Sequence, residues 1–314
     1  IELVHNRQSF WSEAPGFMDS AYMPETYDIL LNRWREIGED VLNAFKDQSI
    51  FQFLDSINDP ILKYSIDGLY CQFIAARNHQ SLFDFFGCRH SVVQGTAMIG
   101  MLESKQDYFD RLDSILGQGY RAVKFKVNPD ALPMLIEVIE SRGDALDYVC
   151  VDANGSFDQS TVKLFDMLPE NVTIEQPVSP NNKHLLLDLI GELPNQVLLD
   201  ESIRSIDDIQ SYTGTGVGIM LKPVCLGGLR QTIKLLNHCN DQLIPCGLSG
   251  YMDSGVGRFF HWLLSQHPSL LLRPDFVWSD YYFHNDVFDV NAAVGADSEL
   301  IVNSQLLERL YSFG

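Results

Sequence analysis

The sequence predicts an α/β fold, a (β/α)8-type barrel accompanied by a smaller α+β unit. From about residue 91, eight short β-branched or apolar runs alternate with helix-like segments, which is typical of parallel βα units. Residues 1–90 lack this alternation and instead contain two long helical patterns. No glycine-rich phosphate-binding turn follows the first run, which disfavours the competing open doubly wound sheet. A closed barrel is therefore the simplest architecture.

The N-terminal region, 1–90, begins with a loop and continues with helices. An amphipathic helix is expected from Pro24 or Glu25 to about Phe45. A second helix is expected over residues 59–77, where Asp59 can cap the helix and Pro60 fits its first turn.

The barrel is expected over residues 91–282. Its strand candidates are 91–99, 120–127, 148–155, 171–178, 196–202, 217–224, 242–249 and a weaker run at 269–278. Helical spacing of apolar residues is found between them, for example at 129–142, 180–191 and 226–239. The tail, 283–314, is expected to form strands or loops that return to the N-terminal unit.

Charge and cysteine content exclude some classes of partner. The formal net charge is −20, from 22 basic and 42 acidic residues. Such a chain repels nucleic acid and anionic membranes, so neither is an expected partner. A small anionic substrate requires a locally positive site. No run of apolar residues is long enough to cross a membrane. The start of the chain lacks a signal-peptide pattern, and the six cysteines are expected to be reduced thiols of a cytoplasmic protein.

Charged residues recur where the predicted strands end. Lys126, Asp152, Glu175, Asp200 and Lys222 follow one another at separations of 26, 23, 25 and 22 residues, about one βα unit each. In a barrel they would meet at the carboxyl-terminal face, where active sites lie. Lys124 precedes Lys126 by two residues and therefore shares its face of the strand.

The acidic members of this set predict a metal site. Three neighbouring carboxylates need a compensating cation, and oxygen ligands suit Mg²⁺, with Mn²⁺ also possible. Zinc is disfavoured because no His or Cys joins the set. The metal and mutual repulsion are expected to lower the lysine pKa values, as a lysine base requires. Each residue alone could instead be a solvated strand end, and the two lysines could snorkel from an edge strand.

The motifs resemble one known family. "KFK", "DANGSF", "EQP", "LDES" and "LKP", in this order, resemble the enolase superfamily in its muconate-lactonising subgroup. The resemblance covers nearly the whole chain and implies that residues 1–90 and the tail form an α+β capping domain. Within the subgroup, the segment "WSEAPGF" is similar to the capping loop of o-succinylbenzoate synthases.

The resemblance implies a role for each site residue. Lys126 would be the general base, Lys124 its partner, and Lys222 would lie on the opposite face of the substrate. Asp152, Glu175 and Asp200 would bind Mg²⁺. The substrate would contact Ser249 and Gly250, while Asn154 and Glu201 would orient the ligands. The loop at Pro15–Phe17 would close over the site and exclude water.

The implied reaction is the Mg²⁺-dependent dehydration of 2-succinyl-6-hydroxy-2,4-cyclohexadiene-1-carboxylate to 2-succinylbenzoate in menaquinone biosynthesis. Lys126 would remove the proton next to the carboxylate, giving a metal-stabilised enediolate. No His/Asp pair follows the fifth strand, which disfavours a mandelate-racemase-like mechanism, and no late DxD motif of the dipeptide epimerases is evident.

Three alternatives remain open. The same residues would serve an N-acylamino acid racemase or a dipeptide epimerase, in which Lys126 and Lys222 exchange protons on opposite faces. Lys222 could also form a Schiff base in an aldolase. A non-enzymatic barrel that only binds a ligand is the third alternative. The sequence leaves the oligomeric state open.

Overall fold

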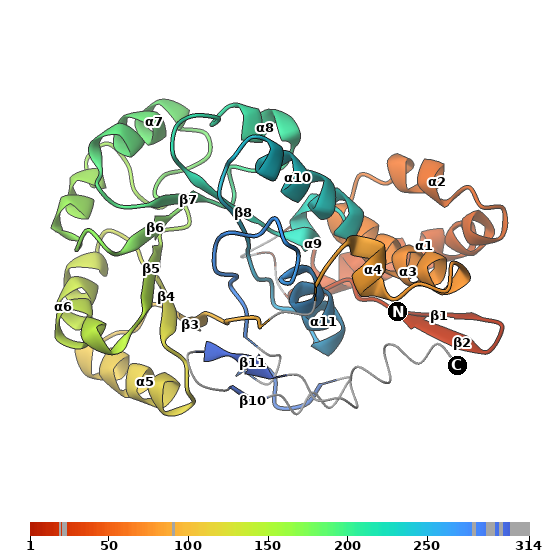
Figure 1. The fold of residues 1–314 in the computed structure, drawn as a ribbon, viewed down its shortest axis with the longest axis horizontal. Coiled ribbons are helices and arrows are strands. Elements are labelled where there is room, and N and C mark those ends of the chain that lie inside the picture. The colour runs from red at the N-terminus through yellow and green to blue at the C-terminus, as the bar shows by residue number, and fades with distance from the viewer. Residues whose placement is uncertain are drawn as a thin grey trace.

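The computed structural model describes residues 1–18, 20, 24–89, 92–277, 281–286, 293–294 and 298–301. Its centre is a parallel sheet of seven strands, ordered β3-β4-β5-β6-β7-β8-β9, so each strand pairs with its neighbour in the sequence. The strands are β3 (Ala97–Ile99), β4 (Ala122–Lys126), β5 (Tyr148–Asp152), β6 (Thr173–Glu175), β7 (Val197–Leu199), β8 (Gly218–Leu221) and β9 (Cys246–Leu248). The predicted α/β class with a curled parallel sheet is confirmed (Figure 1).

Helices cover the outside of the curled sheet (Figure 1). They are α5 (Lys105–Gly117), α6 (Leu132–Arg142), α7 (Lys183–Glu192), α8 (Ile206–Gln210), α9 (Pro223–Leu226), α10 (Leu229–Asp241) and α11 (Gly255–Leu264), with 3₁₀ turns η1 (Gly143–Ala145) and η2 (Val162–Met167). Their apolar stripes face the strands. In α5, for example, Tyr108, Leu112 and Ile115 recur at helical spacing and are all buried. The expected helices at 129–142, 180–191 and 226–239 correspond to α6, α7 and α10.

The eighth strand candidate, 269–278, does not form a strand in its described part. Pro274 interrupts it and has no N–H to donate to a ladder. The segment nevertheless lies between the two edges of the sheet. The amide of Asp275 donates to the carbonyl of Leu248 at 2.9 Å, and the amide of Thr96 donates to the carbonyl of Phe276 at 3.1 Å. An irregular segment thus occupies the place predicted for a regular strand, between β9 and β3.

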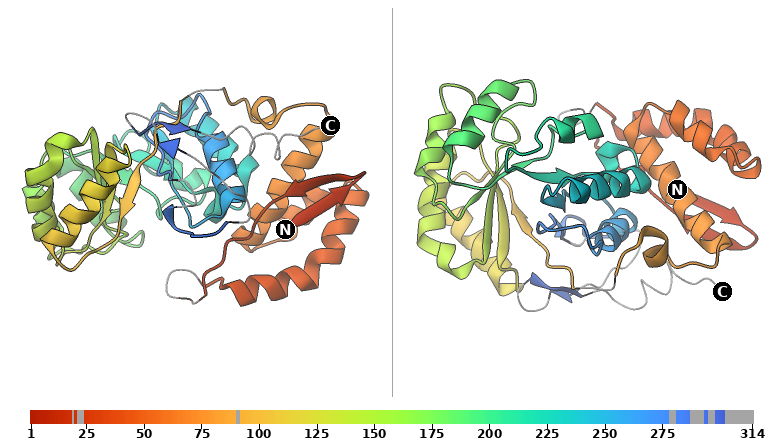
Figure 2. Two further views of the ribbon diagram at one scale, coloured as in Figure 1. Left: turned by 90° about the horizontal axis from the view of Figure 1, so that it is seen from below. Right: turned by 45° about the horizontal axis from the view of Figure 1, so that its top comes forward.

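The N-terminal unit contains a hairpin and four helices beside the barrel (Figure 2). It consists of β1 (Glu2–His5), β2 (Gln8–Trp11), α1 (Tyr27–Lys46), α2 (Ile50–Ser56), α3 (Pro60–Arg77) and α4 (Leu82–Phe86). The two predicted helices are α1 and α3. Asp59 caps α3 as expected, because its Oδ1 accepts from the amides of Ile61 and Leu62 at 3.0 and 3.1 Å.

A partly buried ion pair joins this unit to the barrel. Asp67 of α3 is buried and pairs with the guanidinium of Arg230 at the start of α10. The amide of Arg230 also donates to Asp67 Oδ2 at 3.0 Å. Gly228 has a φ of +143°, and a Cβ there would lie 2.6 Å from Asp67 Oδ2. A glycine is therefore needed for the two units to approach this closely.

The described part of the tail contacts the barrel. Strands β10 (Ala293–Val294) and β11 (Leu300–Ile301) pair antiparallel. The amide of Gly95 donates to the carbonyl of Ser298 at 2.9 Å, and the amide of Leu300 donates to the carbonyl of Val93 at 2.9 Å. Most of residues 283–314, and the predicted boundary at 90–91, lie outside the described residues. The return of the tail to the N-terminal unit therefore remains a prediction.

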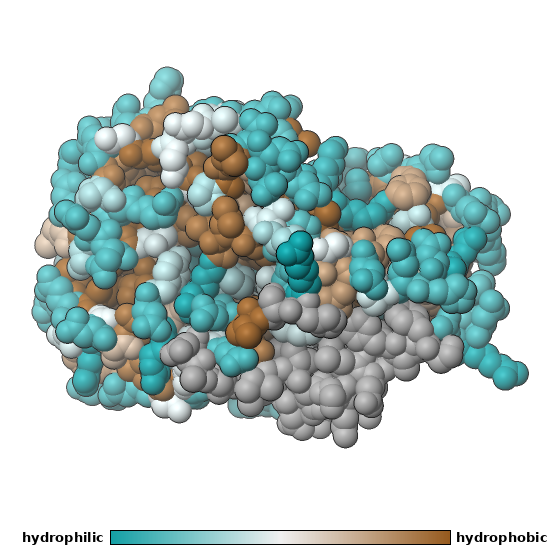
Figure 3. Space-filling view, in the orientation of Figure 1, coloured by the Kyte–Doolittle hydropathy of each residue, from teal (hydrophilic) through white to brown (hydrophobic). Residues whose placement is uncertain are grey.

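The surface in the view of Figure 3 is mostly hydrophilic around the ring of helices, with apolar groups gathered inside it. None of the described helices combines the length and apolar character needed to cross a membrane. All six cysteines are free thiols, as predicted, and five of them are buried.

Candidate active site

The predicted charged residues meet at the carboxyl-terminal edge of the sheet. In the parallel register Lys126 lies beside Asp152, and Asp152 lies beside Glu175. Asp200 directly follows β7 and Lys222 directly follows β8. Because parallel strands end at one edge of a sheet, these side chains reach the same region. The structure thus brings together the positions that the spacing predicts.

Lys124 lies buried among carboxylates. Its Nζ lies 2.9 Å from Glu175 Oε1 and 3.6 Å from Asp152 Oδ2, and it forms a third, closer ion pair with Asp275. Burying an ammonium group is costly unless it is paired. These carboxylates therefore explain how a lysine can occupy an apolar strand.

Asp275 is the member of this cluster that sequence reasoning missed. It is buried and belongs to the irregular segment between β9 and β3. The only signal was its place within the weak eighth run, "SLLLRPDFVW", at the position where a strand would end. That run lacks the regular apolar pattern of the other strand candidates. Asp275 therefore did not stand out as a charged residue at the end of a predicted strand.

Lys222 and Asp200 form a second buried pair. Lys222 Nζ lies 2.6 Å from Asp200 Oδ2, and the Ser249 hydroxyl donates to the same oxygen at 2.9 Å. Ser249, predicted to contact substrate, is thus placed beside a predicted metal ligand. Gly250, the next residue, lines the cavity described below.

Asn154 links Lys126 to the acidic residues. Lys126 Nζ donates to Asn154 Oδ1 at 2.8 Å, and Asn154 Nδ2 donates to Glu201 Oε1 at 2.9 Å. The backbone amide of Asn154 donates to Asp152 Oδ1 at 3.1 Å. Asn154 has a φ of 43°, in the left-handed region that asparagine tolerates better than most residues. At this turn the side-chain amide of Asn154 therefore contacts both Lys126 and Glu201.

Burial and charge shift the pKa values within the cluster. Burial alone would lower the pKa of Lys124, but Asp275, Glu175 and Asp152 together raise it well above its usual value. Burial raises the pKa of Glu175 well above its usual value, and the neighbouring acids add to this shift. Burial opposes ionisation of Asp200, yet Lys222 holds the pKa of that carboxyl below its usual value. For Lys124 the three carboxylates thus outweigh burial, whereas the expected lowering of the lysine pKa values presupposes a bound dication and stays a prediction.

The acidic residues have the chemistry of a divalent-cation site. Two buried oxygens, Glu175 Oε2 and Asp200 Oδ1, have no hydrogen-bond partner, which is costly for a carboxylate. Hard oxygen donors of this kind suit Mg²⁺ or Mn²⁺. Within the described ranges, no three Asp, Glu, His or Cys side chains already stand in the arrangement of a metal centre. Instead, the ammonium groups of Lys124 and Lys222 compensate the acids.

A cavity of about 300 Å³ lies beside this cluster. Its lining residues are Phe17, Met98, Ile99, Gly100, Lys126, Gly250, Tyr251, Met252 and Tyr282. Lys126 is the charged group among them, whereas the walls are mostly apolar and aromatic. Apolar walls with few polar groups are typical of small-molecule sites. Phe17 belongs to the loop predicted to cover the site.

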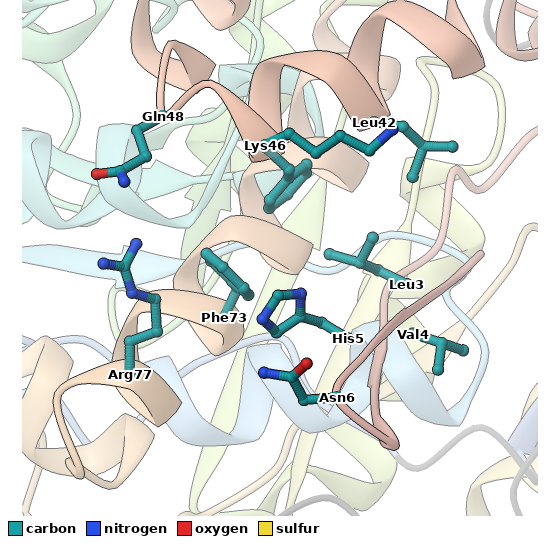
Figure 4. Close-up of a pocket in the computed structure, with 10 residues that line it drawn as sticks. Leu3, Val4, His5, Asn6, Leu42, Lys46, Gln48, Phe73 and Arg77 are labelled. Carbon is teal, nitrogen blue, oxygen red and sulfur yellow. The ribbon is translucent and has the colours of Figure 1, made fainter.

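A second hollow, of about 430 Å³, lies in the N-terminal unit (Figure 4). It is lined by side chains of the β1–β2 hairpin, α1 and α3, including His5, Lys46 and Arg77. No carboxylate is among its lining residues, so it lacks the acidic ligands expected of a magnesium or manganese site. The chemistry predicted from the sequence therefore belongs to the barrel cavity.

Comparison with known proteins identifies relatives. The family described as "Enolase C-terminal domain-like" matches residues 108–305. An o-succinylbenzoate synthase of Enterococcus faecalis is 26% identical over 68% of this chain and 59% of its own length. The Bacillus subtilis synthase is 24% identical over 88% of this chain and 76% of its own length. An N-succinylamino acid racemase of Thermus thermophilus is 24% identical over 74% of this chain and 63% of its own length.

Solved structures share the fold. The structure of a probable mandelate racemase from Alicyclobacillus acidocaldarius superposes with a TM-score of 0.82. The superposition covers 96% of this chain and 84% of the Alicyclobacillus acidocaldarius chain, at 24% sequence identity. The similarity extends over the N-terminal unit as well as the barrel.

Proposed function

Because this chain belongs to the enolase superfamily, in its muconate-lactonising subgroup, we propose that it is an o-succinylbenzoate synthase. One observation carries the proposal furthest. Lys126 lines the cavity, whereas Lys222 is buried in its pair with Asp200 and is not among the lining residues. One lysine that reaches the substrate is enough for a dehydration.

The proposed substrate is 2-succinyl-6-hydroxy-2,4-cyclohexadiene-1-carboxylate. The neutral amine of Lys126 takes the proton from the ring carbon that bears the carboxylate. The electron pair of that C–H bond first moves onto the carboxylate, and it then forms the new ring double bond as the neighbouring C–O bond breaks. Lys126 then returns the proton to the departing hydroxyl, giving 2-succinylbenzoate and water. Similarity to the Enterococcus faecalis and Bacillus subtilis synthases supports this choice.

The surrounding charges make the proton removable. The substrate's carboxylate would gain negative charge as the ring proton leaves, and the ammonium groups of Lys124 and Lys222, at the same edge of the sheet as Lys126, would help to stabilise that charge. Asp152, Glu175 and Asp200 would hold a divalent cation, which supplies further stabilisation of that charge when bound. Lys126, the charged residue that lines the cavity, gives an anionic substrate a positive group to approach in an acidic protein.

Racemisation of an N-succinylamino acid is the second candidate. The similarity to the Thermus thermophilus racemase favours it, as does the presence of two lysines on separate strands. This reaction needs Lys126 and Lys222 on opposite faces of the substrate. Lys222 would first have to leave Asp200, with which it pairs at 2.6 Å.

One pair of assays separates the two candidates. Purified protein with Mg²⁺ is given the cyclohexadiene substrate, and the loss of its ultraviolet absorbance is followed. In parallel, an N-succinylamino acid is incubated with the protein in D₂O and its α-carbon is examined for deuterium. A synthase removes the absorbance. Deuterium incorporation without absorbance loss would contradict the proposal and favour the racemase.

A further inference from the structure

Glu13 connects the N-terminal unit to a barrel helix. It lies just after β2, in the loop that leads to Phe17. Its Oε2 accepts from the Ser254 amide at 3.1 Å, and its Oε1 accepts from the Gly257 amide at 2.9 Å. The Ser254 hydroxyl donates to Oε2 as well. The Ser254 amide belongs to the N-cap residue of α11 and the Gly257 amide to its first turn, where backbone donors lack partners within the helix.

The barrel provides a fitted place for this carboxylate. A Cβ at Gly257 would lie 2.0 Å from Glu13 Oε1 and 2.7 Å from the Cβ of Asp253. Any side chain at position 257 would therefore expel Glu13. Asp253 is buried next to it, and the fully buried Arg258 adds a positive charge nearby. The contact thus depends on Gly257 and on the ionisable side chain of Glu13, which packs next to those of Asp253 and Arg258.

The same loop forms a wall of the cavity. Phe17 packs edge-on against Tyr251, with ring centroids 5.5 Å apart, and both residues line the cavity with Lys126. The C-terminal end of this loop is also fixed, because the Tyr27 amide donates to the Phe17 carbonyl at 2.8 Å. Glu13 lies four residues before Phe17 and supplies contacts with the barrel at the other end of this short loop.

We propose that Glu13 is a positioning residue that holds residues 13–17 against α11 and thereby sets the affinity of the cavity for its substrate. This inference rests on the proposed function for its kinetic test, but the contact itself does not. Glu13 touches neither the cavity nor the acidic cluster. It acts through Phe17, whose ring completes the cavity only while the loop is docked.

Docking of this kind has a defined kinetic consequence. If the loop is docked only part of the time, the apparent dissociation constant rises in inverse proportion to the docked fraction. Chemistry in the docked complex is unchanged, so KM rises while kcat is retained. A loss of folded protein gives the opposite pattern, because kcat per total protein falls and KM stays constant.

Two variants remove the contact from opposite sides. Glu13→Ala deletes the carboxylate, and Gly257→Ala leaves Glu13 intact but fills its place. We expect both to raise KM by about tenfold with kcat within about twofold, since leaving buried hydrogen-bond donors without their partner costs this order of free energy. Glu13→Gln keeps one acceptor and should raise KM less. Ser104→Ala is the matched control, because it removes a helix cap at α5, which is far in sequence from both partners.

Hydrogen exchange tests the contact without turnover. Peptides covering 13–18 and 254–258 should exchange faster in Glu13→Ala and Gly257→Ala than in the parent chain and in Ser104→Ala. If the parent chain shows no synthase activity, the proposed function fails, while this exchange comparison still decides whether Glu13 anchors the loop. Unchanged exchange in both variants would overturn the anchoring. Faster exchange with an unchanged KM, or with a loss of kcat alone, would overturn the role in substrate affinity.

Discussion

The ammonium nitrogen of Lys124 lies 2.9 Å from Glu175 Oε1, although 51 residues and an intervening strand separate the two. Lys124 also contacts Asp152 and Asp275, so one buried ammonium group pairs with three acids. This explains why two lysines can stand on one face of a strand that is otherwise apolar. Lys124 is paired within the sheet, while Lys126 extends to the cavity.

Replacing Lys126 should remove catalysis but not folding. Lys126→Ala deletes the group that takes and returns the proton, and general acid–base catalysis is worth about 10²–10⁴-fold in rate. We expect turnover of the cyclohexadiene substrate to fall at least this far, with an unchanged circular dichroism spectrum and retained Mg²⁺ binding. Lys163→Ala, at an exposed lysine paired with Glu192, is the control. Near-native turnover in Lys126→Ala would refute the base assignment.

Removal of divalent metal should abolish activity reversibly. The unpartnered oxygens of Glu175 and Asp200 are the expected ligand atoms, together with Asp152. We expect EDTA to remove turnover and excess Mg²⁺ or Mn²⁺ to restore it. Zn²⁺ should restore it poorly, since the site offers no His or Cys. Full activity in thoroughly metal-free protein would contradict the ligand assignment.

Asp275 should matter for stability as well as for activity. Asp275→Asn keeps the shape but removes a charge that compensates buried Lys124. We expect the free energy of unfolding in urea to fall by about 1–3 kcal/mol, the usual cost of weakening a buried charged hydrogen bond. Asp107→Asn, at an exposed position in α5, should change it little. Unchanged stability in Asp275→Asn would mean that the remaining acids suffice for Lys124.

Rising pH should loosen the contact between Glu13 and α11. Burial and the neighbouring Asp253 raise the pKa of Glu13 to about 8 from an ordinary value of 4.5. An acid with a raised pKa contributes stability that is fully present below 4.5 and is lost as pH rises through about 8. The pKa of Asp253 is raised too, because burial lifts it to about 6 although the nearby Arg258 and Lys222 favour the ionised form. Its contribution to stability therefore also falls as pH rises. Buried Tyr64 also faces this pair, and its pKa is raised well above its usual value.

The parent chain should therefore lose stability between about pH 4.5 and about pH 8 more steeply than Glu13→Gln, whose side chain does not ionise. Urea unfolding at several pH values in this range measures the slope. Parallel slopes for the two proteins would show that Glu13 does not titrate within the contact.

The sequence predicted the parts of the site that follow the repeat. Asp152, Glu175 and Asp200 each end an apolar run, so their spacing alone placed them on neighbouring strands. Asp275 escaped because Pro274 breaks the run that carries it. Glu13 escaped for another reason: its partner Ser254 lies 241 residues away, and no local pattern encodes such a contact. The raised pKa of Lys124 could not be foreseen in full, because Asp275 was not counted among its neighbours.

Asp152, Glu175 and Asp200 are expected to share one divalent ion beside Lys126. Anomalous scattering from crystals soaked in Mn²⁺, measured at the manganese absorption edge, would locate that ion. We expect one anomalous peak in contact with carboxylate oxygens of all three residues, and its loss in Glu175→Gln. A peak elsewhere, or three acids that stay paired with Lys124 and Lys222 in crystals of metal-activated protein, would contradict it.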